Sequence, residues 1–453
     1  MARRPASDVT GTALFADLFG TEEMRAVFSD GSLIQSWLDA EAALAWAEAE
    51  VGLVPPAAAA EIDRRARADL LDVERLRAGI RETTHPLVAV VWALAELCEG
   101  DAGGWVHWGA TTQDIMDTGT VLQARRAHSL LAARIGALLS VLAQRTREER
   151  DTPMAGRTHG QHAVPTTLGL KLAVFLEELL RHRDRLDELA PRLLVGQLGG
   201  AAGTLASLGE HGPAVRRAFC ARLGLAEPRT AWHTARDGLA EFAHVASMAA
   251  ATCERLAGEV ILLQKTEVGE LAEVHEDGNV GSSTMPQKRN PMRAEGIVAA
   301  SRLARRGLLV ALEGMVGQHE RDMGAWQAEW EWLPDVCAHA DAAVAETVEL
   351  VRTLTVDRAR MRTNLGMTGG LIMSEAVMMA LAPRLGRQRA HEVVHAVAMG
   401  AYAARTSFVD ALLASRHVGL DAAAVDELLD PTRYLGLASI DVDEVLAAYE
   451  ERA

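Results

Sequence analysis

Long runs of helical periodicity constrain this chain more than any other feature of its sequence. From Phe242 to Leu263, small or apolar residues recur every three or four positions, and no proline interrupts the surrounding stretch 230–285. This pattern predicts one helix of about 30 residues, which would be about 45 Å long. Similar runs at 170–189 and 336–354 predict further long helices.

Helices of this kind need partners on more than one side. An apolar stripe left open to water favours association, and alanine-rich helices pack closely in bundles. We therefore expect an all-α fold whose long central helices pack within the chain and between chains, although a single-chain bundle is the alternative. Breaks in the pattern predict an N-terminal helical domain (1–110), a central long-helix domain (111–356) and a C-terminal helical domain (357–453).

Composition limits the classes of partner. The 453 residues are 49% hydrophobic and 24% charged, which is ordinary for a globular protein with a large core. Acidic residues outnumber basic ones by 62 to 46, which gives a net charge of −16. A nucleic-acid surface needs basic faces, so no nucleic-acid partner is expected. A local positive pocket can still bind a small anionic substrate.

Composition also predicts where the protein resides. The four cysteines lie far apart and form no C-x-x-C pair, which is typical of reduced thiols. The N-terminus lacks the apolar core of a secretory signal, and no stretch reaches the roughly 18 uninterrupted apolar residues of a membrane span. We expect a cytoplasmic protein without a membrane partner.

Four polar segments interrupt the helical pattern, and each has a structural and a functional interpretation. The first, 107–114, contains the adjacent hydroxyls of Thr111 and Thr112. It predicts a helix start with capping oxygens, or a helix N-terminus that binds a carboxylate. The second, 156–167, holds two histidines, an arginine and three threonines. Because histidine titrates near neutrality, this donor-rich loop suits proton transfer, although a histidine can also have only a structural role.

The remaining two segments lie further along the chain. The third, 278–291, combines glycines with Ser, Lys and Asn side chains, and Pro291 suits the first turn of a following helix. It is either a solvated linker or a loop that supplies a catalytic base and a positively charged side chain to hold an anion. The fourth, 318–330, is either a charged helix surface or a segment whose Trp326 and Trp330 side chains pack against another group. The sequence has no glycine-rich phosphate loop and no G-x-S-x-G elbow, so we expect chemistry without a cofactor or metal.

These segments carry a family resemblance. The run GSSTMPQKRNP at 281–291 resembles the signature of the fumarase/aspartase superfamily, and 156–167 and 109–117 resemble its other two blocks. The resemblance extends over nearly the whole chain. It implies a homotetramer whose long helices form a twenty-helix bundle, with each active site shared by three subunits.

The resemblance also implies roles at matching positions. Ser282 corresponds to the base that removes the proton next to a carboxylate, and His159 to the acid that protonates the leaving group on the opposite face. Lys288 and Asn290 correspond to residues that hold the resulting doubly negative aci-carboxylate. The further substrate-binding residues expected on this basis are Thr111, Thr112, Thr158, Ser283, His85, Arg321 and Gln327.

Within the superfamily, the sequence most resembles the carboxymuconate cycloisomerase branch, and it also has features similar to adenylosuccinate lyase. Residues 199–205 and 429–436 resemble the carboxymuconate cycloisomerase branch, but its bacterial members carry Trp at the position of His159. His85 and its neighbour are more similar to adenylosuccinate lyase, which places an arginine for a nucleotide phosphate in the stretch that holds Trp330 here.

We therefore expect a lyase that catalyses anti β-elimination, with a C–N bond preferred, from a succinate-type substrate and releases fumarate. The substrate would be a small di- or tricarboxylate. Two alternatives stay open. One is a 3-carboxy-cis,cis-muconate cycloisomerase, which forms a lactone by intramolecular addition. The other is a non-catalytic structural protein, since lens crystallins have been recruited from this superfamily.

Overall fold

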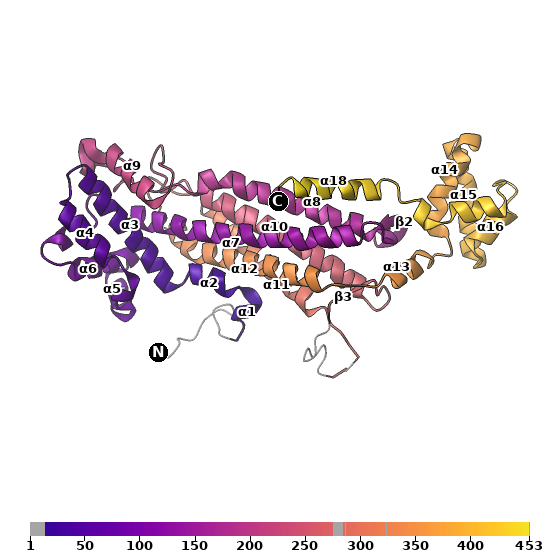
Figure 1. Cartoon of the computed structure of the whole chain (residues 1–453), viewed down its shortest axis with the longest axis horizontal. Helices are drawn as coiled ribbons and strands as arrows, with labels where there is room; N and C mark the ends of the chain where they lie inside the picture. The colour runs from indigo at the N-terminus through magenta and orange to yellow at the C-terminus, as the bar shows by residue number, and fades with distance from the viewer. Residues whose placement is uncertain (1–13, 275–283, 286, 323, 453) are drawn as a thin grey trace. The chain divides into compact units, whose positions relative to one another are not determined.

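The computed structural model describes residues 14–452, apart from 275–283, 286 and 323. Across these residues almost all regular structure is helical, and the strands form two short two-stranded sheets (Figure 1). The predicted all-α class is therefore confirmed. The α-helices are α1 (Ala16–Phe19), α2 (Glu22–Val27), α3 (Asp30–Glu50), α4 (Pro56–Arg65), α5 (Val73–Thr83), α6 (Pro86–Leu97), α7 (Thr112–Glu148), α8 (Leu168–Leu193), α9 (Gly212–Leu223), α10 (Asp237–Gln264), α11 (Met292–Glu313), α12 (Ala325–Thr353), α13 (Arg358–Leu365), α14 (Ser374–Leu385), α15 (Arg387–Ala404), α16 (Phe408–Ala414), α17 (Ala422–Leu428) and α18 (Ala438–Glu450). The strands are β1 (Pro153–Thr158), β2 (Gln161–Thr167), β3 (Leu271–Ala272) and β4 (Thr355–Val356).

The long helices agree with the periodicity of the sequence. The three predicted runs form α8, α10 and α12, with 26, 28 and 29 residues. The longest helix, α7, has 37 residues, and the sequence predicts only its start. By length and apolar composition α7 would be able to cross a membrane. Its first turns, however, bury Asp114, Asp117 and Gln123, each with hydrogen-bond partners in the protein. These side chains identify α7 as a core helix.

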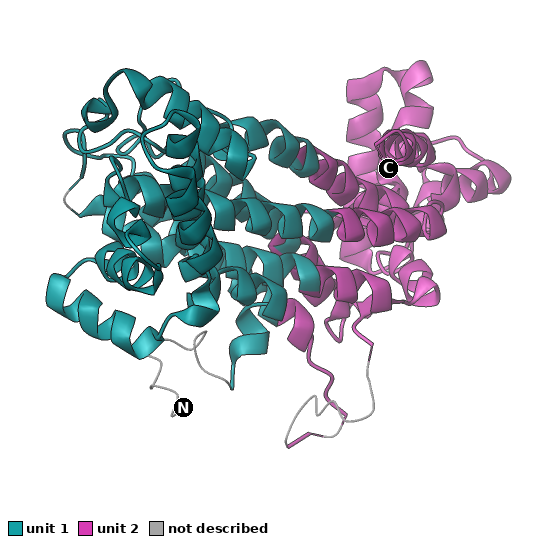
Figure 2. Ribbon diagram, turned by 60° about the vertical axis from the view of Figure 1, so that its left-hand side comes forward, with its two compact units in different colours: residues 1–135, 182–253, 296–345 teal, residues 136–181, 254–295, 346–453 magenta. Residues whose placement is uncertain are grey.

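The chain divides into two compact units (Figure 2). Each unit combines three separate segments, because every division point falls inside one of the helices α7, α8, α10, α11 and α12. The predicted division into three consecutive domains follows chain order rather than contacts, and it stays a prediction. Unit 1 comprises 1–135, 182–253 and 296–345, and unit 2 comprises 136–181, 254–295 and 346–453.

The core of unit 1 is built around α3. The sequence places Ala40, Ala43 and Ala47 at three- and four-residue spacing, and all three are buried. These small side chains let α3 pack closely against α4 and α9, where Phe219 is also fully buried. Helices α5 and α6 contact each other and contribute to the same core. Their packing fixes the short link between them, which carries His85.

Unit 2 has a separate apolar core at its C-terminal end. One buried side chain from each of four consecutive helices contributes to it: Val377 of α14, Val393 of α15, Phe408 of α16 and Val425 of α17. The unit also contains the hairpin of β1 and β2, whose position in the chain matches the second polar segment.

Candidate active site

Thr111 and Thr112 mark the start of α7, as the sequence predicts. The carboxylate of Asp114 accepts a hydrogen bond from the Thr111 backbone N–H at 2.9 Å, which caps the helix. The same carboxylate accepts from the backbone N–H groups of Gly199 at 2.8 Å and Gly200 at 2.9 Å. Because Asp114 is fully buried, it fixes the glycine-rich segment firmly against the helix start.

Arg321 places a positive charge at this helix start. Its Nη1 donates to Thr111 Oγ1 at 2.7 Å, and its Nε donates to Gln113 Oε1 at 3.1 Å. Gln113 is buried and donates through Nε2 to the His233 carbonyl at 2.9 Å, so the guanidinium has a fixed partner. The helix N-terminus adds the partial positive charge of its free N–H groups. Together these donors form an electropositive position suited to a carboxylate.

His85 joins the same group from the link between α5 and α6. Its Nε2 lies 3.1 Å from Thr112 Oγ1. Burial lowers the pKa of His85, and the positive charges of Arg321 and His107 lower it further. The imidazole is therefore neutral near pH 7. Its Nδ1 is buried and has no hydrogen-bond partner among the described residues. A substrate atom at this position would complete its hydrogen bonding.

His107 forms a partly buried pair with Glu41, which sequence analysis does not predict. Its Nδ1 lies 2.6 Å from Oε1 of Glu41, a residue whose exposed fraction is 2%. Burial opposes protonation of His107, but the charge and hydrogen bond of Glu41 outweigh burial and raise its pKa. The two residues are 66 positions apart, so no local pattern connects them.

A buried ionic cluster lies at the first turns of α7. The Arg236 guanidinium donates to Asp117 at 2.9 Å and to Glu329 at 2.9 Å, and none of the three residues is more than 5% exposed. Trp326 Nε1 donates to Asp117 Oδ1 at 2.9 Å, and the Trp232 ring lies 4.8 Å from the guanidinium. Burial lowers the pKa of Arg236, but the charges of the two carboxylates outweigh burial and raise this pKa above its usual range. The cluster holds the start of α12 against α7.

His159 lies at the tip of a β-hairpin, whereas the sequence predicts only a donor-rich loop without strands on either side. Strands β1 and β2 pair antiparallel, with Thr158 opposite Gln161, so His159 and Gly160 form the two-residue turn. Both turn residues have positive φ, 51° and 75°, as a type I′ turn requires. Thr158 and His159 are exposed and belong to unit 2. At this tip the imidazole is accessible to another molecule.

Lys288 and Asn290 lie in the segment that leads into α11, and Lys288 is exposed. The carboxylate of Glu273 accepts hydrogen bonds from two backbone N–H groups in the first turn of α11, at 3.1 and 2.7 Å. This cap anchors the end of the segment. Ser282 and Ser283, the predicted base and its neighbour, lie outside the described residues.

The structure brings some of the predicted residues together within unit 1. Gln327 is exposed in the first turn of α12. Sequence reasoning used Gln113 and Asp114 only as part of a predicted helix start and did not assign them to the site, although their places beside Thr111 and Thr112 were a usable signal. Thr158, His159, Lys288 and Asn290 belong to unit 2, while four predicted residues meet in unit 1: His85, Thr111, Thr112 and Arg321.

Helix α15 carries a pattern that bears on the expectation of a metal-free protein. His391-Glu392-Val393-Val394-His395 has the H-E-x-x-H spacing, which places two histidines on one face of a helix. Their rings stack with centroids 5.9 Å apart, and both residues are exposed. Within the described part of the chain, no group of three or more His, Cys, Asp or Glu side chains could hold a metal ion. Two histidines alone do not supply the three protein ligands of a catalytic zinc site. The match therefore assigns no metal.

Comparison with known proteins identifies the family. Residues 19–304 match a family model described as Lyase, and residues 370–445 match one described as adenylosuccinate lyase C-terminus. The chain belongs to the fumarase/aspartase superfamily. The resemblance in the sequence blocks is thereby confirmed.

Relatives within the fumarase/aspartase superfamily match the chain over nearly its full length. The 3-carboxy-cis,cis-muconate cycloisomerase of Pseudomonas aeruginosa is 45% identical over 448 residues, which is 98% of each chain. The N-acetyl-S-(2-succino)cysteine lyase of Dickeya dadantii is 38% identical over 445 residues, 97% of each chain. The crystal structure of 3-carboxy-cis,cis-muconate lactonizing enzyme from Pseudomonas putida has a TM-score of 0.92 at 42% identity and covers 97% of this chain and 99% of that one. The protein is therefore an enzyme of a superfamily that includes both lyases and cycloisomerases.

Proposed function

We propose that this protein catalyses anti β-elimination from a substituted succinate and releases fumarate. The observation that carries the proposal is the 2.7 Å contact from Arg321 to Thr111 at the N-terminus of α7, with Gln113 as the second partner of the guanidinium. Charge-assisted hydrogen bonds and free helix N–H groups suit one carboxylate of a small dicarboxylate. His85 beside Thr112 adds a neutral donor or acceptor.

In the proposed reaction, Ser282 removes the proton from the carbon next to one carboxylate. The electron pair is held as a doubly negative aci-carboxylate, which Lys288 and Asn290 stabilise. The pair then forms the C=C bond of fumarate as the bond from the neighbouring carbon to nitrogen breaks. His159 donates a proton to the departing amine from the opposite face. Serine is a weak base unaided, so its activation depends on the positive charge of Lys288.

Subunit assembly is part of this proposal. The proposed acid, His159, is exposed at a hairpin tip. Large apolar side chains are also exposed on the long helices: Val174 at 50%, Leu262 at 50% and Leu309 at 66%. Such apolar surface favours association. This surface supports the assembly that the superfamily resemblance implies, and we infer a cytoplasmic homotetramer in which each active site combines residues of three subunits.

A second candidate is lactonising cycloisomerisation of a carboxymuconate. It is favoured by the 45% identity to the Pseudomonas aeruginosa cycloisomerase and by the TM-score of 0.92 to the Pseudomonas putida enzyme. Both reactions need a bound carboxylate, so Arg321 and Thr111 suit either. We prefer elimination because His159 supplies an acid where bacterial cycloisomerases carry Trp. A relative named as a succinocysteine lyase also supports a succinate substrate. A non-catalytic structural role is disfavoured because the chain retains the proposed base, carboxylate-binding and acid residues: Ser282, Lys288, Asn290 and His159.

A substrate panel distinguishes these reactions. The purified protein is incubated with N- and S-substituted succinates and, separately, with 3-carboxy-cis,cis-muconate, and fumarate and lactone are measured. We expect fumarate from at least one N-substituted succinate. Lactone formation together with no fumarate from the whole panel would assign the cycloisomerase reaction instead.

Replacement of the guanidinium tests the carboxylate position directly. Arg321→Met should lower kcat/KM by about tenfold to a hundredfold, because a hydrogen bond to a charged group contributes roughly 1.5–3 kcal/mol. Arg387→Met is the matched control, since Arg387 is an exposed arginine in the first turn of α15. Equal kcat/KM in the two variants would show that Arg321 does not hold the substrate.

A further inference from the structure

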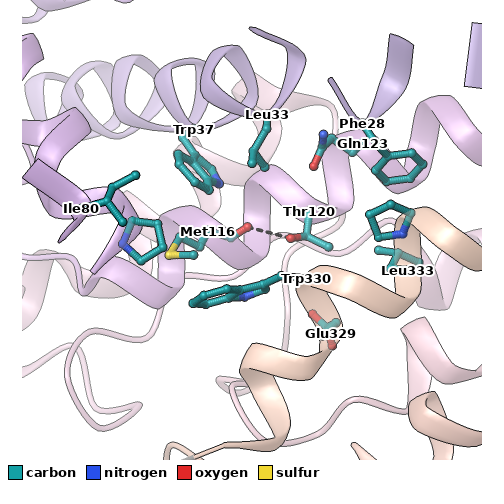
Figure 3. Close-up of a pocket in the computed structure, with 12 residues that line it drawn as sticks. Phe28, Leu33, Trp37, Ile80, Met116, Thr120, Gln123, Glu329, Trp330 and Leu333 are labelled. Atoms are coloured by element: carbon teal, nitrogen blue, oxygen red, sulfur yellow. Dashed lines mark hydrogen bonds between the residues drawn. The ribbon is translucent and has the colours of Figure 1, made fainter. Parts of the chain in front are cut away.

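An apolar cavity of about 250 Å³ lies within unit 1. Figure 3 shows Trp37 and Trp330 on opposite sides of it, with Met116 and Thr120 of α7 between them. An engineered cavity of about 150 Å³ in another protein holds benzene, so this one has room for a benzene-sized ring and a few further atoms. Phe28, Pro86, Gln123, Glu329 and Pro334 also line it.

The cavity lies on the side of α7 that carries the candidate carboxylate position. Thr112, Met116 and Thr120 follow one another at four-residue spacing, which places them on one face of the helix. Pro86, another wall residue, directly follows His85, whose Nε2 lies 3.1 Å from Thr112 Oγ1. A molecule bound at Thr112 and His85 would therefore have the cavity next to it along α7.

Three polar side chains in the wall have partners within the protein, whereas the buried indole Nε1 of Trp37 has none among the described residues. Thr120 Oγ1 donates to the Met116 carbonyl at 3.0 Å, and Gln123 Nε2 donates to the Val27 carbonyl at 2.9 Å. Glu329 accepts from Arg236 at 2.9 Å, which compensates its charge. Because Thr120, Gln123 and Glu329 are engaged within the protein and the rest of the wall is mainly apolar, the cavity favours a largely apolar occupant.

Proline and tryptophan give the cavity its shape. Pro334 lies inside α12 and has no N–H to donate to the carbonyl of Trp330, four residues earlier, so the helix is weakened at the cavity wall. The indole rings of Trp330 and Trp37, together with Phe28, provide aromatic surfaces. Aromatic pairs in offset or edge-to-face arrangement favour a flat ring over a branched aliphatic group.

We propose that this cavity receives the apolar part of the leaving group, so that the preferred substrates are succinates whose nitrogen carries an aromatic ring of about benzene's size. The inference rests on the elimination proposed above. It gives the leaving group a chemical class: an arylamine rather than ammonia, a small alkylamine or a phosphorylated nucleotide.

The wild-type enzyme tests this with N-substituted aspartates of increasing size: aspartate, N-methylaspartate, N-phenylaspartate and N-biphenylylaspartate. Fumarate release gives kcat/KM for each. We expect the phenyl compound to exceed the methyl compound at least tenfold, and the biphenylyl compound to fall below the phenyl one. Equal or lower kcat/KM for the phenyl compound, with the small substrates still turned over, would overturn the cavity inference and leave elimination intact. No fumarate from any N- or S-substituted succinate would overturn elimination and this inference with it.

Variants at Thr120 test the cavity itself. Thr120→Leu adds volume inside it, and the phenyl-to-methyl ratio of kcat/KM should approach one. Thr120→Val is the matched control, because it keeps the side-chain volume and should keep the ratio. Trp330→Ala removes one aromatic wall from a partly exposed position and should also lower the ratio. Circular dichroism verifies folding of each variant. An unchanged ratio in both Thr120→Leu and Trp330→Ala would refute the assignment.

Discussion

Glu48 is expected to lower the folding stability of this protein as the pH rises. Its side chain lies in α3 with no exposed surface, and neither carboxylate oxygen has a hydrogen-bond partner among the described residues. Burial, followed by the negative charge of Glu41, raises the pKa of Glu48 from 4.5 to about 9. The folded protein therefore holds a proton at neutral pH that the unfolded chain releases.

The magnitude follows from linkage. Above pH 4.5 the unfolded chain loses this proton while the folded chain keeps it, so stability falls as pH rises and levels off only near pH 9. The raised pKa of Glu48 lowers the free energy of unfolding by about 1 kcal/mol at pH 5 and about 3 kcal/mol at pH 7, compared with its value well below pH 4.5. Each pKa unit between the folded and unfolded states corresponds to about 1.4 kcal/mol. Glu48→Gln removes the titration, so the variant should gain stability over wild type as pH increases.

Urea unfolding at one fixed protein concentration measures this difference at pH 5, 7 and 8.5. Any loss of packing or hydrogen bonding in the Gln side chain is independent of pH, so the slope of the difference against pH is the informative quantity. Glu50→Gln is the control, since Glu50 lies on the same helix but is exposed. A difference in unfolding free energy between wild type and Glu48→Gln that stays constant from pH 5 to 8.5 would refute the reasoning.

Four other outcomes follow from the site. Ser282→Ala should lower kcat by at least about 10², the scale of losing a positioned base, with an unchanged circular dichroism spectrum; turnover at the wild-type rate would exclude its role. Lys288→Ala should weaken binding of a dicarboxylate inhibitor in calorimetry. Equal affinity in wild type and variant would show that Lys288 does not hold the carboxylate. Glu41→Gln should lower the pKa of His107 in an NMR titration, because the carboxylate is what raises that pKa; an unmoved titration would contradict the pairing. Arg236→Met should destabilise the fold by about 3–5 kcal/mol in urea unfolding, since two buried carboxylates lose their partner, and a neutral result would show that they become protonated instead.

The parts of the fold that were predictable are those encoded locally. Helices α8, α10 and α12 follow from apolar spacing, and the start of α7 follows from Thr111, Thr112 and the acidic residue after them. The hairpin was not predictable in the same way, because a type I′ turn is usually signalled by Asn-Gly or Asp-Gly rather than by His159-Gly160.

The contacts that build the site come from residues far apart in the chain. Arg321 and Thr111 are 210 positions apart, and Arg236 and Asp117 are 119 positions apart. Periodicity acts over a few turns of helix, so it carries no information on such pairs. The family resemblance supplied Arg321 and Thr111 as candidates, but it supplied no partner for Arg236, whose role is to hold helices together rather than to contact a substrate.

Asp114 shows how such a scaffold can mislead experiment. Besides capping α7 and holding Gly199 and Gly200, its carboxylate lies 2.8 Å from His233 Nε2, so one side chain with no exposed surface joins three distant stretches of polypeptide. A mutational screen scored by growth or total turnover will rank this position with true catalysts. Only a rate expressed per correctly folded molecule separates an enzyme that lacks chemistry from one that never assembled.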